Sequence, residues 1–147
     1  MNFKTILIAG AIFLTSSAQA NIIIQTPNNA DVCANLAGVW AGGGKVSAGI
    51  IQCHYHGTVN ITKTAGDNNY NMDVVLRKDD GICPDDEKLQ LPGTCSNGVI
   101  NLHTQDANLN GSMNPAGTAI DLAGNVTFTV LGSRVKADVS DMHMQKQ

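Results

Sequence analysis

Residues Asn125 to Leu131, NVTFTVL, carry the clearest alternation of apolar and polar side chains in this chain. Val126, Phe128 and Val130 fall on one side of the alternation, and polar residues fall on the other. Because successive side chains of a β-strand point to opposite faces, the pattern predicts a half-buried strand whose apolar face points inward.

The same rhythm of short alternating segments and turns recurs about every ten residues on both sides of this stretch. We predict strands at 36–41, 56–64, 70–77, 88–91, 99–104, 109–113, 118–122, 125–131 and 134–144. Helical periodicity is hard to find between them, so no parallel crossover is expected. Short strands joined by tight turns predict an all-β fold, an antiparallel up-and-down (meander) barrel of about eight strands.

The first twenty residues are typical of a signal peptide. Lys4 precedes the apolar run ILIAGAIFL, and Ala18-Gln19-Ala20 forms a small-x-small cleavage site. The run is shorter than the roughly twenty apolar residues that span a bilayer. We therefore expect a signal peptide at 1–20, a flexible N-terminal arm at 21–30 and a single β-barrel domain at 31–147. The domain should be secreted or periplasmic and carry no membrane anchor.

Four cysteines, Cys33, Cys53, Cys83 and Cys95, lie after the predicted leader. An even number of cysteines in an exported chain predicts two disulfides, with three possible connectivities. We favour the sequential pairing 33–53 and 83–95, because a strand pair can bring each of these spans together. A tetrathiolate zinc site is the weaker alternative, because neither pair has the short spacing that structural zinc sites favour.

Charge and composition exclude several classes of partner. Nine Lys and Arg face twelve Asp and Glu, and no basic cluster is present. This argues against nucleic acid and anionic membranes, both of which need clustered positive charge. Aromatic residues make up only 4% of the chain. That scarcity argues against sites that stack biotin or sugars between aromatic rings.

The segment CANLAGVW, residues 33–40, contains the pattern Leu36-x-Gly38-x-Trp40 at the start of the predicted meander. It resembles the opening strand of the calycin superfamily, which comprises lipocalins, avidins and small bacterial metalloprotease inhibitors. The resemblance implies a lipocalin-like barrel and a structural role for Trp40 as the plug that closes one end. It implies no catalysis.

Cys53-His54-Tyr55-His56 is the one local cluster with metal-ligand chemistry. On a strand, His54 and His56 share a face, and a competent site needs a third ligand. His103 is the best candidate, and the C-terminal Met142-His143-Met144 segment is the second. The simpler interpretation is two solvent-facing histidines beside a disulfide.

The five carboxylates between Asp79 and Glu87 fit a solvated surface loop better than a calcium site, because their spacing matches no EF-hand.

Catalytic motifs are scarce. No serine lies in Gly-x-Ser-x-Gly, and the cysteines are expected to be oxidised. We therefore expect no enzymatic activity and no cofactor.

An eight-stranded barrel is either filled by side chains or holds one small ligand, and the sequence leaves both open. The sequence favours an exported binding protein that takes a small apolar ligand in the barrel or a protein partner through its loops. One alternative is an inhibitor of a secreted protease, with the arm 21–30 entering the active site. The other is a metal-binding protein that uses His54 and His56.

Overall fold

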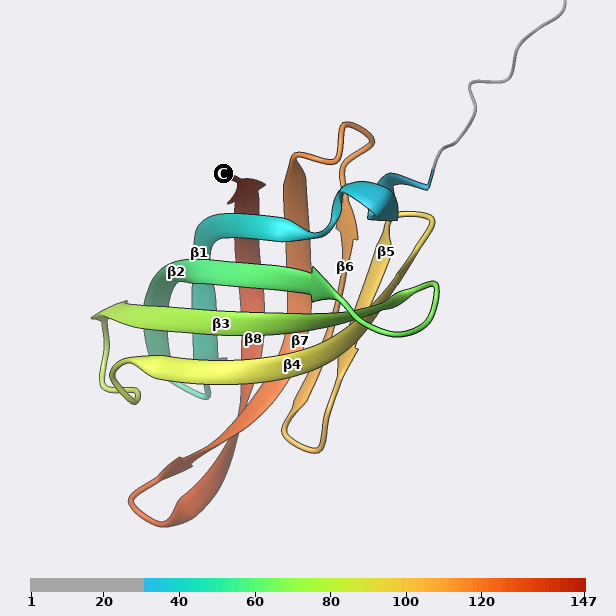
Figure 1. Cartoon of the computed structure of the whole chain (residues 1–147). Coiled ribbons are helices and arrows are strands. Elements are labelled where there is room, and N and C mark those ends of the chain that lie inside the picture. Colours follow the sequence, from blue (N-terminus) through green and yellow to red (C-terminus); the bar gives the residue numbers. More distant parts are fainter. Residues whose placement is uncertain (1–30) are drawn as a thin grey trace, which may run out of the picture.

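Eight strands follow a short 3-10 helix in Asp31 to Gln147, the part of the chain that the computed structural model describes (Figure 1). The elements are η1 (Val32–Asn35), β1 (Gly38–Ala48), β2 (Ile51–Lys63), β3 (Asn69–Asp80), β4 (Glu87–Ser96), β5 (Val99–His103), β6 (Ala107–Met113), β7 (Ala119–Val130) and β8 (Ser133–Lys146). Each strand pairs antiparallel with the next, and β8 pairs with β1, so the sheet closes. The predicted up-and-down barrel is confirmed. The predicted signal peptide and N-terminal arm, residues 1–30, lie outside the described residues.

Most strands are longer than the sequence predicts, and β1 and β7 differ most from the prediction. β1 continues through Gly42, Gly43 and Gly44 to Ala48, well beyond the predicted end at residue 41. The predicted strands 118–122 and 125–131 are one strand, β7, with a register shift between Leu122 and Gly124. Glycine weakens a strand pattern in the sequence, but in a barrel it marks the bends and bulges at which a strand turns without ending.

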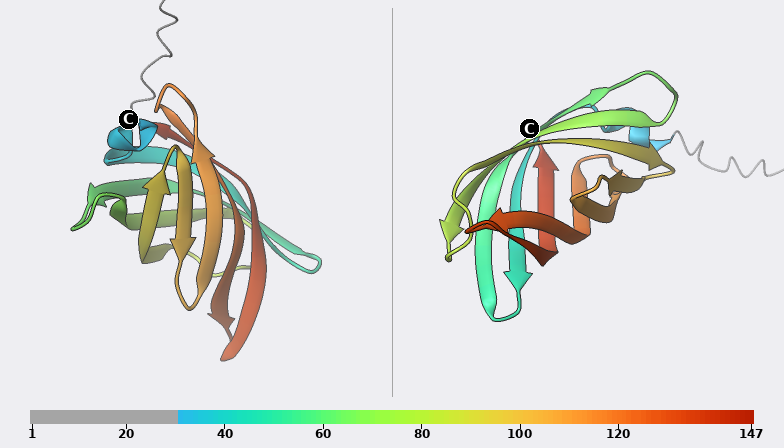
Figure 2. Two further views of the ribbon diagram at one scale, coloured as in Figure 1. Left: turned by 90° about the vertical axis from the view of Figure 1, so that its right-hand side faces the viewer. Right: turned by 90° about the horizontal axis from the view of Figure 1, so that it is seen from below.

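The two ends of the barrel are built differently. Because neighbouring strands run in opposite directions, the turns β2–β3, β4–β5 and β6–β7 lie at one end with η1 and the C-terminus (Figures 1 and 2). We call this the closed end. The turns β1–β2, β3–β4, β5–β6 and β7–β8 lie at the other, the open end. Within the described residues, no helix is long and apolar enough to cross a membrane.

η1 covers the closed end and is fixed there by side-chain contacts. Leu36 and Trp40 are fully buried, and Trp40 Nε1 donates to Leu36 O over 2.8 Å. The Tyr70 hydroxyl donates to Cys33 O over 2.9 Å, and Lys146 Nζ donates to Asn35 O. Trp40 is therefore buried at the closed end, with its one polar atom satisfied.

The disulfides join Cys33 to Cys95 and Cys53 to Cys83, so the predicted sequential pairing was wrong. Cys33 precedes β1 at the closed end, whereas Cys53 lies opposite Val46 near the open end. The eight residue-to-residue steps from Gly38 to Val46 put about 25 Å between the two regions. The sequential pairing fails because β1 lies between Cys33 and Cys53 in the chain, and a single strand runs from one end of the barrel to the other.

Each end of the barrel therefore has its own disulfide. The sequence separations are 62 residues for Cys33–Cys95 and 30 for Cys53–Cys83. Constraint of the unfolded chain over spans of this length stabilises a fold by about 4 kcal/mol each.

Glycines allow β1 to approach both of its neighbours. A Cβ atom at Gly42 would lie 2.0 Å from His143 O on β8, and one at Gly43 would lie 2.5 Å from Tyr55 O on β2. On β2, a Cβ at Gly57 would lie 2.1 Å from Val75 O. Only a residue without a side chain fits at these points, so the glycines permit the curvature that closes the barrel.

The disulfide pairing can be read from a non-reducing tryptic digest. Cleavage after Lys45, Lys63, Lys78, Lys88 and Arg134 places each cysteine on a different peptide. We expect mass spectrometry to find the peptide ending at Lys45 joined to 89–134, and 46–63 joined to 79–88. Finding the peptide ending at Lys45 joined to 46–63 would contradict this structure.

The contribution of the glycines can be measured by substitution. Gly42→Ala should lower the free energy of unfolding by about 2–3 kcal/mol, because the added methyl group overlaps a backbone carbonyl. The matched control is Gly49→Ala, where no atom lies within 4 Å and only the φ of +60° opposes the side chain. The control substitution should lower the free energy of unfolding by about 1 kcal/mol. Urea unfolding measures both, and equal losses would refute the close-approach argument.

Candidate functional site

An apolar cavity of about 340 Å³ occupies the lumen and opens at the open end of the barrel. Aliphatic and methionine side chains from strands all round the barrel form its walls, among them Val59, Met72, Val74, Leu102, Leu122 and Met144. The sequence left a filled and a hollow lumen equally open. The structure has the hollow one.

Small residues on one side of the wall account for the empty space. Gly42, Gly44 and Gly57 line the cavity and contribute no side chain to fill it. The core is accordingly divided into a large cluster around Trp40 and a small one of Cys53, Tyr55 and Cys83 near the open end. The glycine run was visible in the sequence, but its position on the lumen wall depends on how β1 pairs.

The mouth of the cavity is bordered by polar groups and by a strand that is paired on one side only. β4 pairs with β5 only from Gly93 to Ser96, whereas Glu87, Leu89 and Gln90 line the cavity. Thr104 and Asp106 of the β5–β6 turn lie on the same border. Polar atoms thus surround the entrance, and the wall behind it is apolar.

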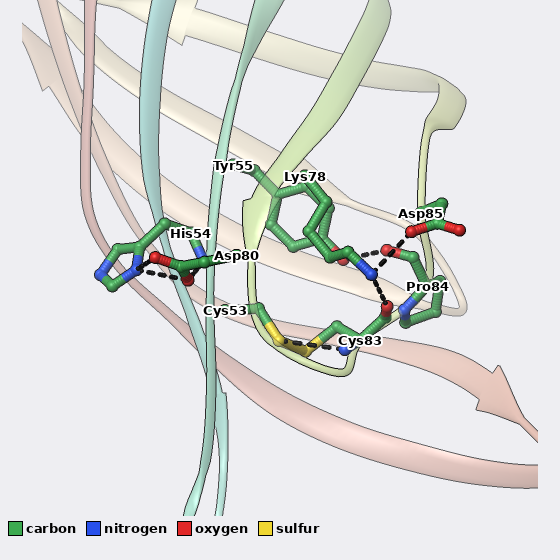
Figure 3. The surroundings of a disulfide bond; sticks show 8 residues. All are labelled: Cys53, His54, Tyr55, Lys78, Asp80, Cys83, Pro84 and Asp85. Atoms are coloured by element: carbon green, nitrogen blue, oxygen red, sulfur yellow. Dashed lines mark hydrogen bonds and ion pairs between the residues drawn. A yellow bond between two sulfur atoms is a disulfide. The ribbon is translucent and has the colours of Figure 1, made fainter.

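The β3–β4 loop is held against β2 beside the mouth (Figure 3). The Cys53–Cys83 disulfide joins them, and the Tyr55 hydroxyl donates to Pro84 O over 2.6 Å. Lys78 Nζ lies 2.8 Å from Cys83 O and 2.6 Å from an Asp85 carboxylate oxygen. These contacts fix Pro84, which lines the cavity, so this part of the entrance is preformed.

The electrostatic environment at the mouth is negative. Burial raises the pKa of the Tyr55 phenol above its ordinary value of 10.0, and the carboxylates of Glu87 and Asp85 raise it further. Burial and the charge of Asp31 likewise raise the pKa of Tyr70 at the closed end. Both hydroxyls therefore stay protonated and remain hydrogen-bond donors at physiological pH.

The predicted metal ligands are not brought together. His54 and His56 share the outer face of β2 as predicted, but His103 lies on β5, three strands further round the barrel. Among residues 31–147, no group of three or more His, Cys, Asp or Glu side chains could hold a metal ion.

The histidines on this outer surface have carboxylate partners instead. His54 Nδ1 lies 2.9 Å from Asp80, and His56 pairs with Asp79. The hydrogen bonds from His54 hold the pKa of the Asp80 carboxyl below its ordinary value. His143, from the second candidate segment, lies 2.6 Å from Asp121 on β7. The acidic residues 79 and 80 thus form cross-strand pairs rather than a calcium loop.

No protein-family model matches the chain, and no curated protein sequence matches it either.

The two tyrosines provide a test of the burial at each end. In the folded protein both should titrate above pH 10, and in denaturant both should return to about pH 10. Because the folded pKa values are raised, their contribution to stability is complete below pH 10 and is lost as the pH rises through them. Ultraviolet absorbance of the phenolate measures the titration. A tyrosine that ionises at or below pH 10 in the folded state would contradict the assigned contacts.

Proposed function

We propose that this protein binds a small apolar molecule in the lumen of its barrel and carries out no catalysis. The observation that carries the proposal is the open, apolar cavity of about 340 Å³. Concave apolar cavities with a few polar groups at the entrance are the usual form of small-molecule sites. The volume is at the lower end of the 300–1,000 Å³ range typical of such sites. The ligand is therefore a compact molecule, or one whose polar end stays outside.

The distribution of charge favours particular ligands. The titratable residues that line the cavity are Tyr55, Glu87 and Asp106, all at the mouth. An anionic headgroup placed there would face Glu87, whereas a neutral or cationic one would not be repelled. We propose neutral or amine-bearing apolar molecules as the ligand class, in preference to carboxylates such as fatty acids.

The side-chain chemistry of the residues that line the cavity also supports binding over catalysis. Among the described residues of the lumen there is no histidine, lysine or free thiol to act as a general base or nucleophile. Asp106 is already paired with Arg134, and the Tyr55 hydroxyl is engaged with Pro84. These groups position the rim of the barrel.

The barrel and the buried Trp40 also support a calycin-like relationship, which we include in the proposal. The two disulfides indicate an oxidising compartment, and we propose export through the predicted signal peptide. The protease-inhibitor alternative depends on the arm 21–30, which lies outside the described residues. The cavity favours small-molecule binding over the metal alternative, whose third ligand, His103, lies three strands away from His54 and His56.

Binding can be measured with N-phenyl-1-naphthylamine, a neutral probe that becomes fluorescent in apolar surroundings. We expect saturable binding, and at least tenfold weaker binding by Val74→Trp, whose indole would occupy the cavity. The matched control is Val75→Trp on the same strand, because Val75 is 39% exposed and lies outside the lumen. The control should bind as the parent does.

Val126→Trp provides a second blocking variant at a half-buried position nearer the mouth. Circular dichroism and thermal unfolding verify that each variant is folded. Equal binding by the lumen variants and Val75→Trp would exclude the cavity as the site. The anionic probe 1-anilinonaphthalene-8-sulfonate should bind more weakly than the neutral one, and the reverse order would refute the proposed ligand class.

A further inference from the structure

Three hairpin tips at the open end carry large aliphatic side chains that face solvent. Ile50 in the β1–β2 turn is fully exposed, as is Leu131 in the β7–β8 turn, and Ile82 in the β3–β4 loop is 79% exposed. These hairpins are neighbours round the barrel, because β8 pairs with β1 and β2 pairs with β3. We call the three side chains the apolar rim. The cavity opens at this same end of the molecule.

The backbone conformation of the β7–β8 turn does not favour an aliphatic residue at its tip. Leu131 has a φ of +48° and Gly132 a φ of +82°, the pattern of a type I′ turn in which asparagine, aspartate or glycine is favoured at both positions. A leucine there carries a conformational cost that asparagine largely avoids. Strain of this kind at an exposed position points to function.

The closed end of the same barrel provides an internal comparison. Its β4–β5 turn is Asn97-Gly98, with φ values of +51° and +78°, so it uses the usual residues for the same backbone conformation. The other closed-end turns, 64–68 and 114–118, contain no large aliphatic residue. The fold therefore does not require apolar tips, and they occur only where the cavity opens.

We propose that the apolar rim is a docking surface for a lipid–water interface with electrically neutral headgroups. The three side chains are single residues on separate hairpins, without the exposed aromatic or arginine anchors that form the centre of a protein interface. A fluid hydrocarbon layer accepts separate aliphatic tips without shape complementarity.

Charge decides which lipids fit. Five carboxylates lie within the nine residues from Asp79 to Glu87, on both sides of Ile82. Lys78 pairs with Asp85, and His54 and His56 pair with Asp80 and Asp79. Asp86 and Glu87 have no such partner among the described residues, and they leave the surroundings of this tip negative. An anionic bilayer would repel this surface, whereas a zwitterionic one would not. Because the contact is made by only three side chains, it should be weak and reversible, and the mouth would then lie against the lipid.

The test uses the oxidised, folded protein and sedimentation with sucrose-loaded vesicles. The parent protein should bind phosphatidylcholine vesicles, and the triple variant Ile50→Asn/Ile82→Asn/Leu131→Asn should bind at least tenfold more weakly. Asparagine suits the positive φ at position 131, so the variant should keep its fold. The matched control Val39→Thr/Val75→Thr/Val99→Thr removes three half-exposed valines from the strands and should bind like the parent.

Binding to phosphatidylglycerol vesicles should be weaker than binding to phosphatidylcholine. Failure of the parent to bind phosphatidylcholine, or equal binding by the triple variant, would overturn the proposal. A lipid-free dimer in sedimentation velocity that the triple variant abolishes would also overturn it, because the tips would then serve a second copy of the chain. Binding of N-phenyl-1-naphthylamine by the triple variant should be unchanged, which separates failure of this inference from failure of the lumen as a binding site.

Discussion

The structure depends on β1 pairing with two strands at once, β2 on one side and β8 on the other. This is possible because the run from Gly42 to Gly44 brings the three backbones closer together than any side chain would allow. Closure removes the exposed edges of β1 and β8 and encloses a lumen. Gly42 and Gly44 line that lumen without filling it, so one local property of the chain both closes the barrel and leaves it hollow.

Closure also gives the barrel two different ends, one covered and one at which the cavity opens. At the closed end, the Cys33–Cys95 disulfide, the buried Trp40 and the Tyr70 hydroxyl hold η1 over the lumen. At the open end, the second disulfide fixes one loop beside the mouth and leaves the entrance free. The turns at the closed end are polar, whereas the apolar rim lies at the open end. One end is covered by η1, and access to the lumen lies at the other.

Most of the fold could be predicted from local pattern, and the candidate site could not. Alternation located the strands, because the period of two is a property of neighbouring residues such as Val126 and Phe128. The disulfide pairing failed for a non-local reason, since each cysteine pairs with one that is distant in the chain and that the barrel brings to the same end. The distance between His103 and His54 is likewise non-local, because it is set by the order of strands round the barrel.

The all-β class, the meander and the two disulfides could be predicted from the amino-acid sequence. The class and the meander follow from side-chain periodicity and turn residues, which act over a few residues, and the disulfides follow from an even number of cysteines. The pairing of the cysteines, the hollow lumen and the position of Ile50, Ile82 and Leu131 at the end where the cavity opens are visible only in the folded barrel. Each of these depends on the register in which distant strands meet, and the barrel sets that register only when it closes.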